Sequence, residues 1–228
     1  MQIGANVGVI CVYSCGGGTV VTAVGCNPAF RGFESHPPLK LKLIKMKKIY
    51  LIHGWGGTGT GGWFDWIKKE MKDKAEVHSF DMPNTEEPKI EDWVGYLEEK
   101  INIGDLDEHT YFVGHSIGCQ TIIRFLEKLP KHKKIGGCIF VAGWFDLINL
   151  EPEEFAIAHP WTNTKISFER VLDHCNNFLA LFSTNDPYVH LDEAEKFKEK
   201  LNAKIIIKHN EEHFNNIKEI PEILKFIK

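Results

Sequence analysis

The feature that most restricts the fold is the run Tyr111–Phe125, whose sequence is YFVGHSIGCQTIIRF. Strand-forming residues lead directly into GHSIG at positions 114–118, and apolar residues at helical spacing begin at once. A plain turn between a strand and a helix would favour Asn, Asp or Pro. A serine between two glycines instead predicts a strained turn that lifts the hydroxyl of Ser116 clear of a sheet. This arrangement is typical of a serine nucleophile.

From residue 46 onward, buried-strand patterns alternate with amphipathic helical patterns. The expected strands are residues 48–53, 75–80, 111–113, 135–142, 178–182 and 203–207, and the expected helices are residues 63–72, 90–101, 117–129, 191–201 and 217–227. Such alternation predicts a mainly six-stranded parallel sheet covered by helices on both faces, a three-layer α/β sandwich. Residues 144–175 interrupt the alternation and are the expected lid.

The first 45 residues differ from the rest in composition. Residues 1–39 contain one Arg and one Glu, together with three consecutive glycines and three of the six cysteines. The codons for residues 32–35 (GFES) can contain GGTTCGAATCC, which is typical of the T arm of a transfer-RNA gene. We therefore expect residues 1–45 to be an atypical extension, either disordered or the product of a mis-assigned start. Residues 46–228 are then a single domain with its start at Met46.

Composition excludes several classes of partner. The formal net charge is −4 and no dense stripe of Lys and Arg is present, so nucleic acid is not expected. No apolar run is long enough to cross a bilayer, so no membrane association is expected. The cysteines stand at positions 11, 15, 26, 119, 138 and 175, without the spacing of a disulfide framework or a zinc ribbon. Free thiols predict a cytoplasmic protein.

Two further residues are expected beside the serine. Ligands bind at the carboxyl ends of strands in such a sheet, and Ser116 directly follows one. Asp186 follows the fifth expected strand and His213 lies in the loop after the sixth, in the order nucleophile, acid, histidine. Asp146 is the alternative acid. His209 is the alternative histidine, although it directly continues a strand, which favours a surface or structural role. His209 and His213 could together suggest a metal site, but no third ligand is evident in the sequence, so no metal is expected.

Backbone amides and tryptophans complete the expected site. An oxyanion hole would use the amide of Ile117, directly after the serine, and an amide from the loop after the first strand. In that loop Trp55 is the expected donor, and Gly56 is the alternative. Trp144 and Trp161, from the expected lid, are candidate walls of an apolar substrate pocket, although core packing explains each of them equally well.

Four segments together resemble a known family. Residues 52–57 (IHGWGG), 114–118 (GHSIG), 185–189 (NDPYV) and 213–214 (HF) are similar to the small α/β-hydrolase family of retinoblastoma-binding protein nine, from about Met46 to the C-terminus. The resemblance implies a compact α/β-hydrolase-type serine hydrolase with a short lid and the triad Ser116, Asp186 and His213. Two departures stand out: Glu212 replaces the usual glycine, and no Leu-x-Cys-x-Glu motif is present, so no retinoblastoma-type partner is expected.

The expected activity is cleavage of small carboxylic esters or amides through an acyl-enzyme, without a cofactor, by a monomer or homodimer. One alternative is a catalytically inert binding protein of the same fold. The other is an NAD(P)-binding Rossmann-type oxidoreductase, because residues 54–59 (GWGGTG) match G-x-G-x-x-G and Asp81 stands where a ribose-binding acid would. That alternative leaves the glycines around Ser116 without a role.

Overall fold

The computed structural model of the chain describes residues 11–15, 19–23 and 45–227. The chain divides into two compact units, residues 1–45 and 46–228. In the first, β1 (Cys11–Cys15) pairs antiparallel with β2 (Thr19–Ala23). Our predictions of disorder and of a mis-assigned start fall largely on residues outside those described.

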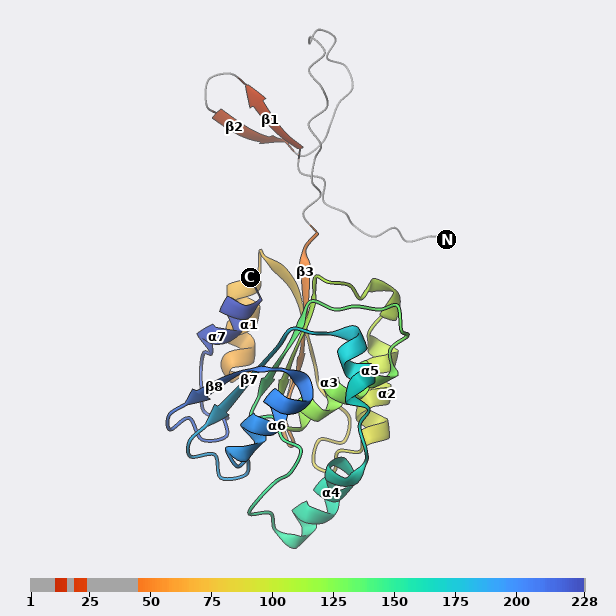
Figure 1. The fold of residues 1–228 in the computed structure, drawn as a ribbon. Coiled ribbons are helices and arrows are strands. Elements are labelled where there is room, and N and C mark those ends of the chain that lie inside the picture. Colours follow the sequence, from red (N-terminus) through yellow and green to blue (C-terminus); the bar gives the residue numbers. More distant parts are fainter. Residues whose placement is uncertain (1–10, 16–18, 24–44, 228) are drawn as a thin grey trace. The chain divides into compact units, whose positions relative to one another are not determined.

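A parallel six-stranded sheet forms the centre of the second unit (Figure 1). The strand order is β4-β3-β5-β6-β7-β8, and every neighbouring pair is parallel. The strands are β3 (Lys47–Ile52), β4 (Ala75–Phe80), β5 (Thr110–His115), β6 (Gly137–Val141), β7 (Phe178–Ser183) and β8 (Lys204–Lys208). The predicted α/β sandwich with six parallel strands is therefore confirmed.

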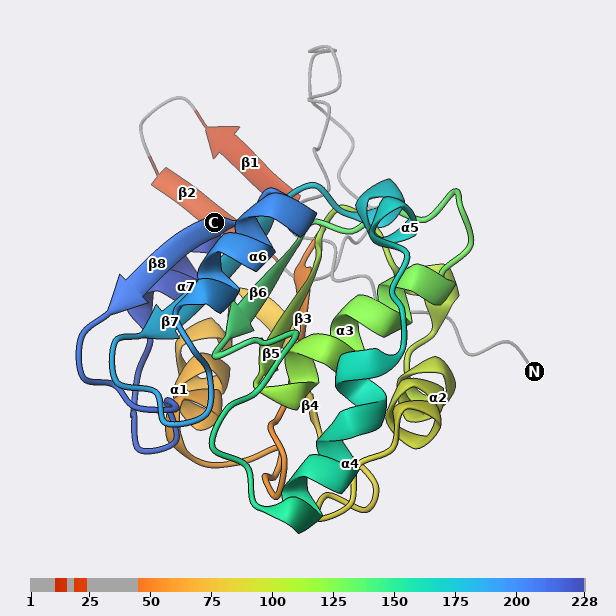
Figure 2. The same ribbon diagram turned by 60° about the horizontal axis from the view of Figure 1, so that its bottom comes forward.

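Helices cover both faces of this sheet (Figures 1 and 2). One face carries α1 (Gly62–Met71) and α7 (Pro221–Phe226). The other carries α2 (Ile90–Lys100), α3 (Ile117–Lys128), α5 (Phe168–His174) and α6 (Asp192–Leu201). No helix among residues 45–227 is both long and apolar enough to cross a membrane.

Side-chain alternation along the strands produces two apolar cores, one on each face. In β3, Ile49 and Leu51 pack toward α1 and α7, whereas Tyr50 and Ile52 pack toward α2 and α3. The sheet register aligns these positions, since Leu51 lies beside Val113. Because both faces are buried, the central strands β5, β6 and β7 have near-continuous apolar sequences. This is the pattern from which they were predicted.

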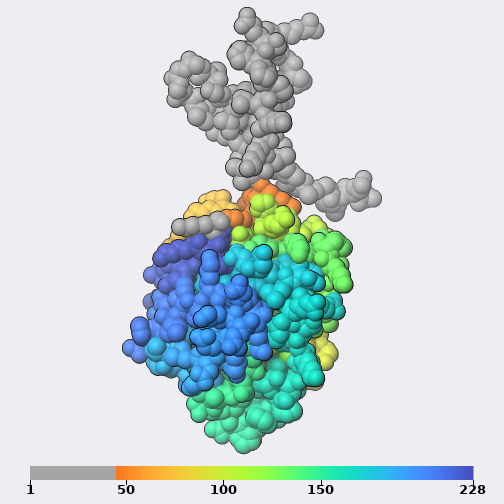
Figure 3. Space-filling view, in the orientation of Figure 1, coloured from red at the N-terminus to blue at the C-terminus, as the bar shows by residue number. Residues whose placement is uncertain are grey.

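Two segments differ from the expected helices. The last helix begins at Pro221 rather than at residue 217, because the residue before a proline is disfavoured in helical conformation, and Ile220 has φ −132° and ψ 84°. The expected lid contains two helices, α4 (Pro152–Asn163) and α5. α5 packs against α3, while α4 lies at the end of the unit toward which the strands run (Figures 1 and 3).

Candidate active site

Ser116 occupies a strained turn between β5 and α3. Its φ of 51° and ψ of −121° lie in a region that side-chain-bearing residues rarely adopt. The flanking glycines are required by close packing. A Cβ on Gly114 would lie 2.8 Å from the backbone nitrogen of Cys119, and one on Gly118 would lie 2.4 Å from the carbonyl oxygen of Ile52. The turn therefore has the geometry predicted for a nucleophile position.

His213 and Asp186 lie in direct contact on neighbouring loops. The Nδ1 of His213 is 2.8 Å from Oδ2 and 3.0 Å from Oδ1 of Asp186. A carboxylate accepts hydrogen bonds, so Nδ1 carries the proton and Nε2 is left as a free acceptor. The amides of Tyr188 and Val189 also donate to Asp186 Oδ1, at 2.9 and 3.1 Å, and hold the carboxylate in its direction.

The loop that carries His213 is fastened to the loop that carries Asp186. The Ser183 hydroxyl accepts a hydrogen bond from the amide of Glu211 at 2.9 Å, and Asn185 Oδ1 accepts one from the amide of Glu212 at 2.9 Å. Ser183 also donates to Asn185 Oδ1. Glu212 has φ 48°, the left-handed conformation that glycine adopts without strain. The residue that replaces the usual glycine thus keeps a glycine-like backbone.

Two buried histidines support the same end of the sheet. His115 donates from Nε2 to the carbonyl oxygen of His213 at 2.7 Å, and burial lowers the pKa of His115 to about 3. His53 accepts the amide of Met82 on Nε2 at 2.9 Å and donates from Nδ1 to the carbonyl oxygen of Gly54. Burial also lowers the pKa of His53. At neutral pH both rings are therefore uncharged, and they hold neighbouring backbone groups by hydrogen bonds.

Two backbone amides near Ser116, those of Trp55 and Ile117, have no hydrogen-bond acceptor among the described residues. Gly56 donates its amide to Thr85 and Gly57 donates to Gly54, whereas the Trp55 amide has no acceptor among the described residues. The Ile117 amide lies at the first position of α3, where helical amides lack an intrahelical partner. In this loop the geometry favours Trp55 over Gly56 as an oxyanion donor.

A cavity of about 650 Å³ opens over Ser116 and His213, both of which line it. The glycine-rich loop after β3 lines it, as do Leu147, Leu150 and Glu154 from the segment after β6. Ser116 and His213 are only 7% and 8% exposed, so both side chains are largely shielded from solvent.

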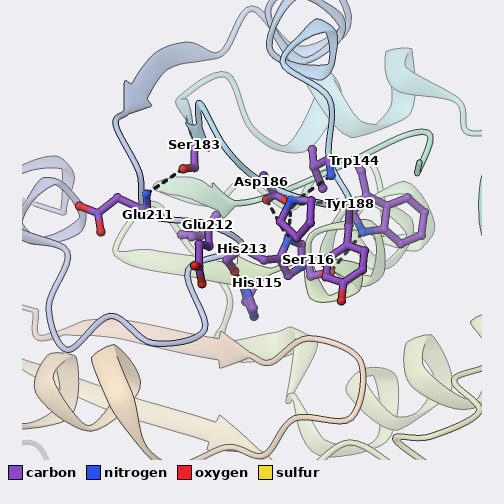
Figure 4. Close-up of polar contacts among 12 residues, drawn as sticks. His115, Ser116, Trp144, Ser183, Asp186, Tyr188, Glu211, Glu212 and His213 are labelled. Carbon is purple, nitrogen blue, oxygen red and sulfur yellow. Dashed lines mark hydrogen bonds and ion pairs between the residues drawn. The ribbon is translucent and has the colours of Figure 1, made fainter. Parts of the chain in front are cut away.

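The two tryptophans considered as pocket walls occupy different places. Neither lines the cavity. Trp144 donates its indole N–H to Ser116 Oγ at 3.3 Å, and Figure 4 shows the indole reaching the serine. Trp161 is buried in the core, where its indole donates to the carbonyl oxygen of Pro88.

The alternative residues lie elsewhere or are occupied. Asp146 is exposed and accepts the amide of Leu147. His209 is exposed, as expected. Asp81, the candidate ribose ligand, accepts the amide of Gly59 at 2.7 Å and so fastens the glycine-rich loop. Among the described residues no group of three or more potential metal ligands occurs.

Three contacting residues were not predicted from the sequence: Ser183 and Asn185 hold the His213 loop, and His115 bonds to the backbone of that loop. Trp144 was a candidate pocket wall, and the structure instead places its indole N–H on Ser116. The position of Asn185, directly before Asp186, was the one signal available, since Asn side chains commonly bond to nearby backbone amides.

Two curated proteins are similar to this chain in sequence. YdeN of Bacillus subtilis (strain 168) is 28% identical over 169 residues, which cover 74% of this chain and 86% of YdeN. The serine hydrolase RBBP9 of Rattus norvegicus is 23% identical over 180 residues, which cover 77% of this chain and 90% of that protein.

Solved structures share the fold. The crystal structure of the ydeN gene product from B. subtilis matches with a TM-score of 0.71 and 26% identity, covering 80% of this chain and 98% of that one. A structure from work on carboxylesterases of Nitrososphaera gargenis matches with a TM-score of 0.58 and 16% identity, covering 80% and 89%. At that identity the likeness extends to the fold alone.

A family model described as serine hydrolase matches residues 49–222, which is most of the chain. The match contains the turn at Ser116 and the loops of Asp186 and His213. This chain belongs to the serine hydrolase family.

Proposed function

We propose that this enzyme cleaves small carboxylic esters or amides through an acyl-enzyme, with Ser116 as nucleophile, His213 as base and Asp186 as the acid that orients it. The observation that carries the proposal is the pair of hydrogen bonds from His213 Nδ1 to Asp186, at 2.8 and 3.0 Å. In a neutral His213 they place the proton on Nδ1 and leave Nε2 as the acceptor, and His213 and Ser116 line the same cavity.

The chemistry follows from these positions. His213 Nε2 takes the proton of Ser116 while Oγ forms a bond to the substrate carbonyl carbon, and Asp186 stabilises the imidazolium that results. The tetrahedral oxyanion accepts hydrogen bonds from the amides of Trp55 and Ile117, each of which typically contributes about 3 kcal/mol. His213 then protonates the leaving group. Water, deprotonated by the same nitrogen, releases the acid and restores Ser116.

The cavity supports a small substrate. Its volume of about 650 Å³ suits a compact ester, and its walls mix glycine, threonine and aromatic residues with two glutamates. Carboxylesterases occur among the fold neighbours, which makes simple carboxylic esters the class to test first. Every residue of the proposed site lies within residues 46–228, which we propose form the complete catalytic unit, with residues 144–175 as the lid. A chain that begins at Met46 should then retain the esterase activity.

A panel of nitrophenyl esters of increasing acyl length tests this proposal. The enzyme should hydrolyse short acyl esters faster than long ones, and Ser116→Ala should abolish turnover while the protein remains folded. Undiminished hydrolysis by Ser116→Ala would contradict the assignment of the nucleophile. A preference for long acyl chains would contradict the proposed substrate size.

A further inference from the structure

The indole of Trp144 makes its one hydrogen bond to the oxygen of the proposed nucleophile. Trp144 Nε1 lies 3.3 Å from Ser116 Oγ, and the side chain is only 1% exposed. A buried indole N–H needs an acceptor. Here it donates to the hydroxyl oxygen rather than to a carbonyl of the surrounding core.

The segment around Trp144 is held on both sides. Gln120, one turn along α3 from Ser116, donates from Nε2 to the carbonyl oxygen of Trp144 at 2.7 Å. The next amide, that of Phe145, donates to Oε2 of Glu193 at 2.6 Å, and Glu193 is itself 2% exposed. These two hydrogen bonds hold the backbone at Trp144 and at the next residue, and so limit the freedom of the indole to move away from Ser116.

We propose that Trp144 is a further catalytic residue, whose indole N–H stabilises the negative charge that develops on Ser116 Oγ as the proton passes to His213. This inference rests on the proposed function. It differs from the oxyanion hole, because the donor acts on the attacking oxygen and not on the carbonyl oxygen of the substrate.

The hydroxyl of Ser116 has room for all its partners. Its hydrogen points to His213 Nε2 during proton transfer, one lone pair accepts from Trp144, and the second lone pair attacks the substrate carbon. A hydrogen bond to a charged oxygen is roughly twice as strong as one to a neutral oxygen. The bond from Trp144 is therefore stronger in the transition state than in the resting enzyme, which is the condition for a rate effect.

The same donor acts in both halves of the reaction. In the acyl-enzyme, Oγ is an ester oxygen and a weak acceptor. Negative charge returns to it when the bond to the acyl carbon breaks and His213 returns the proton. Acylation and deacylation should therefore both slow when the indole N–H is removed.

Trp144→Phe removes the N–H and keeps an aromatic ring in the core. We expect kcat to fall about tenfold, with KM changed less than twofold and the pH dependence of kcat/KM unshifted, because His213 and Asp186 are untouched. The rate at which a fluorophosphonate labels Ser116 should fall by a similar factor. A packing defect would instead raise KM or shift the pH profile.

Trp93→Phe is the matched control. Trp93 is fully buried in the same core and donates its indole N–H at 2.8 Å to the carbonyl oxygen of Pro83 rather than to the serine. It should lose stability while keeping kcat. Replacing Trp144 by β-(3-benzothienyl)alanine, which has the same shape without the N–H, gives a second variant should the phenylalanine variant fold poorly.

The results distinguish a failure of this inference from a failure of the proposed function on which it rests. If the folded Trp144 variants hydrolyse esters and accept the label within twofold of the wild-type rate, the role of Trp144 is overturned while the proposed function stands. An equal loss in Trp93→Phe also overturns it. If the wild-type protein shows neither hydrolysis nor labelling, both proposals fall.

Discussion

At the residue scale, the direction of the Asp186 carboxylate decides which nitrogen of His213 can act as a base. Both carboxylate oxygens lie within hydrogen-bonding distance of Nδ1. The amides of Tyr188 and Val189 hold one of those oxygens, so the carboxylate cannot turn away without breaking two further hydrogen bonds. The orientation of the His213 ring, whose residue lines the cavity, is thereby fixed.

Asp186→Asn tests this arrangement. The amide preserves the shape of the carboxylate but favours the wrong tautomer of His213, so kcat should fall roughly a thousandfold to ten-thousandfold. Asp146→Asn is the matched control: the side chain of Asp146 is exposed, and its replacement should leave kcat within about twofold. Steady-state hydrolysis of a short nitrophenyl ester measures both variants. An equal loss of kcat in the two variants, or a larger loss in Asp146→Asn, would contradict the role of Asp186 and favour Asp146 as the acid.

At the element scale, the segments at the ends of β7 and β8 are held together by hydrogen bonds. Ser183 and Asn185 accept hydrogen bonds from consecutive amides of the β8–α7 loop. That loop then turns through Glu212 and Phe214, both with φ near 50° to 60°. The left-handed turn at Glu212 costs a residue with a side chain roughly 1–2 kcal/mol, which the hydrogen bonds between the loops offset.

Glu212→Gly and Glu212→Val therefore form a matched pair. Glycine relieves the left-handed strain while increasing the entropy of the unfolded chain, so its free energy of unfolding should stay within about 1 kcal/mol of wild type, with kcat preserved. Valine is poorly tolerated at positive φ and should cost more than about 1 kcal/mol and lower kcat. Urea denaturation and ester hydrolysis report the two effects. A well-tolerated valine would show that the strain at this position is unimportant.

The buried His115 links the same elements and makes stability depend on pH. Its pKa in the folded protein is about 3, lowered by burial and by the neighbouring His213, while Asp186 acts in the opposite direction. The unfolded chain has an ordinary histidine pKa near 6.5. As pH falls below that value, the unfolded state binds a proton that the folded state does not, so stability is lost between about pH 6.5 and pH 3.

His115→Gln removes this proton while its amide can still donate to the His213 carbonyl. Between pH 7.5 and pH 5, wild type should lose about 2 kcal/mol more free energy of unfolding than the variant. Urea denaturation at the two pH values gives the difference. Equal losses in the two proteins would show that His115 is protonated as easily in the folded protein as in the unfolded chain.

At the scale of the whole molecule, the alternation of buried strands with amphipathic helices was enough to predict the sheet and its covering helices. The turn at Ser116 was predictable because Gly114 and Gly118 are required by the close approach of backbone atoms. Asp186 and His213 were predictable because topology brings the ends of β7 and β8 together.

Other features depend on contacts that no local pattern encodes. The hydrogen bond from Trp144 to Ser116 depends on how the segment after β6 packs across α3, which neither segment specifies alone. The buried position of Trp161 likewise depends on how α4 packs against the core. The start of the last helix could have been predicted, since Pro221 marks it by the ordinary rule for prolines.

Charge around the cavity predicts a preference among substrates. Glu86 and Glu154 line it, and no Lys or Arg is among its lining residues. A carboxylate near a charged substrate contributes about 1 kcal/mol in a water-like medium, and salt screens it. Because a carboxylate attracts a cation and repels an anion, the difference between the two is about 2 kcal/mol, and of two short esters of equal size a cationic one should have about thirtyfold higher kcat/KM than an anionic one at low salt.

The preference for the cationic ester should become smaller in Glu86→Gln and at high salt. It should not change in Glu87→Gln, because Glu87 does not line the cavity. Hydrolysis of the two esters by the three proteins at two salt concentrations measures this. Faster hydrolysis of the anionic ester would contradict the prediction.

The most direct measurement of the central claim is peptide mapping by mass spectrometry after reaction with a fluorophosphonate. The account predicts a single adduct, on Ser116, that is absent in Ser116→Ala and forms much more slowly in His213→Ala. An adduct on another residue, or an unchanged rate of labelling in His213→Ala, would contradict it.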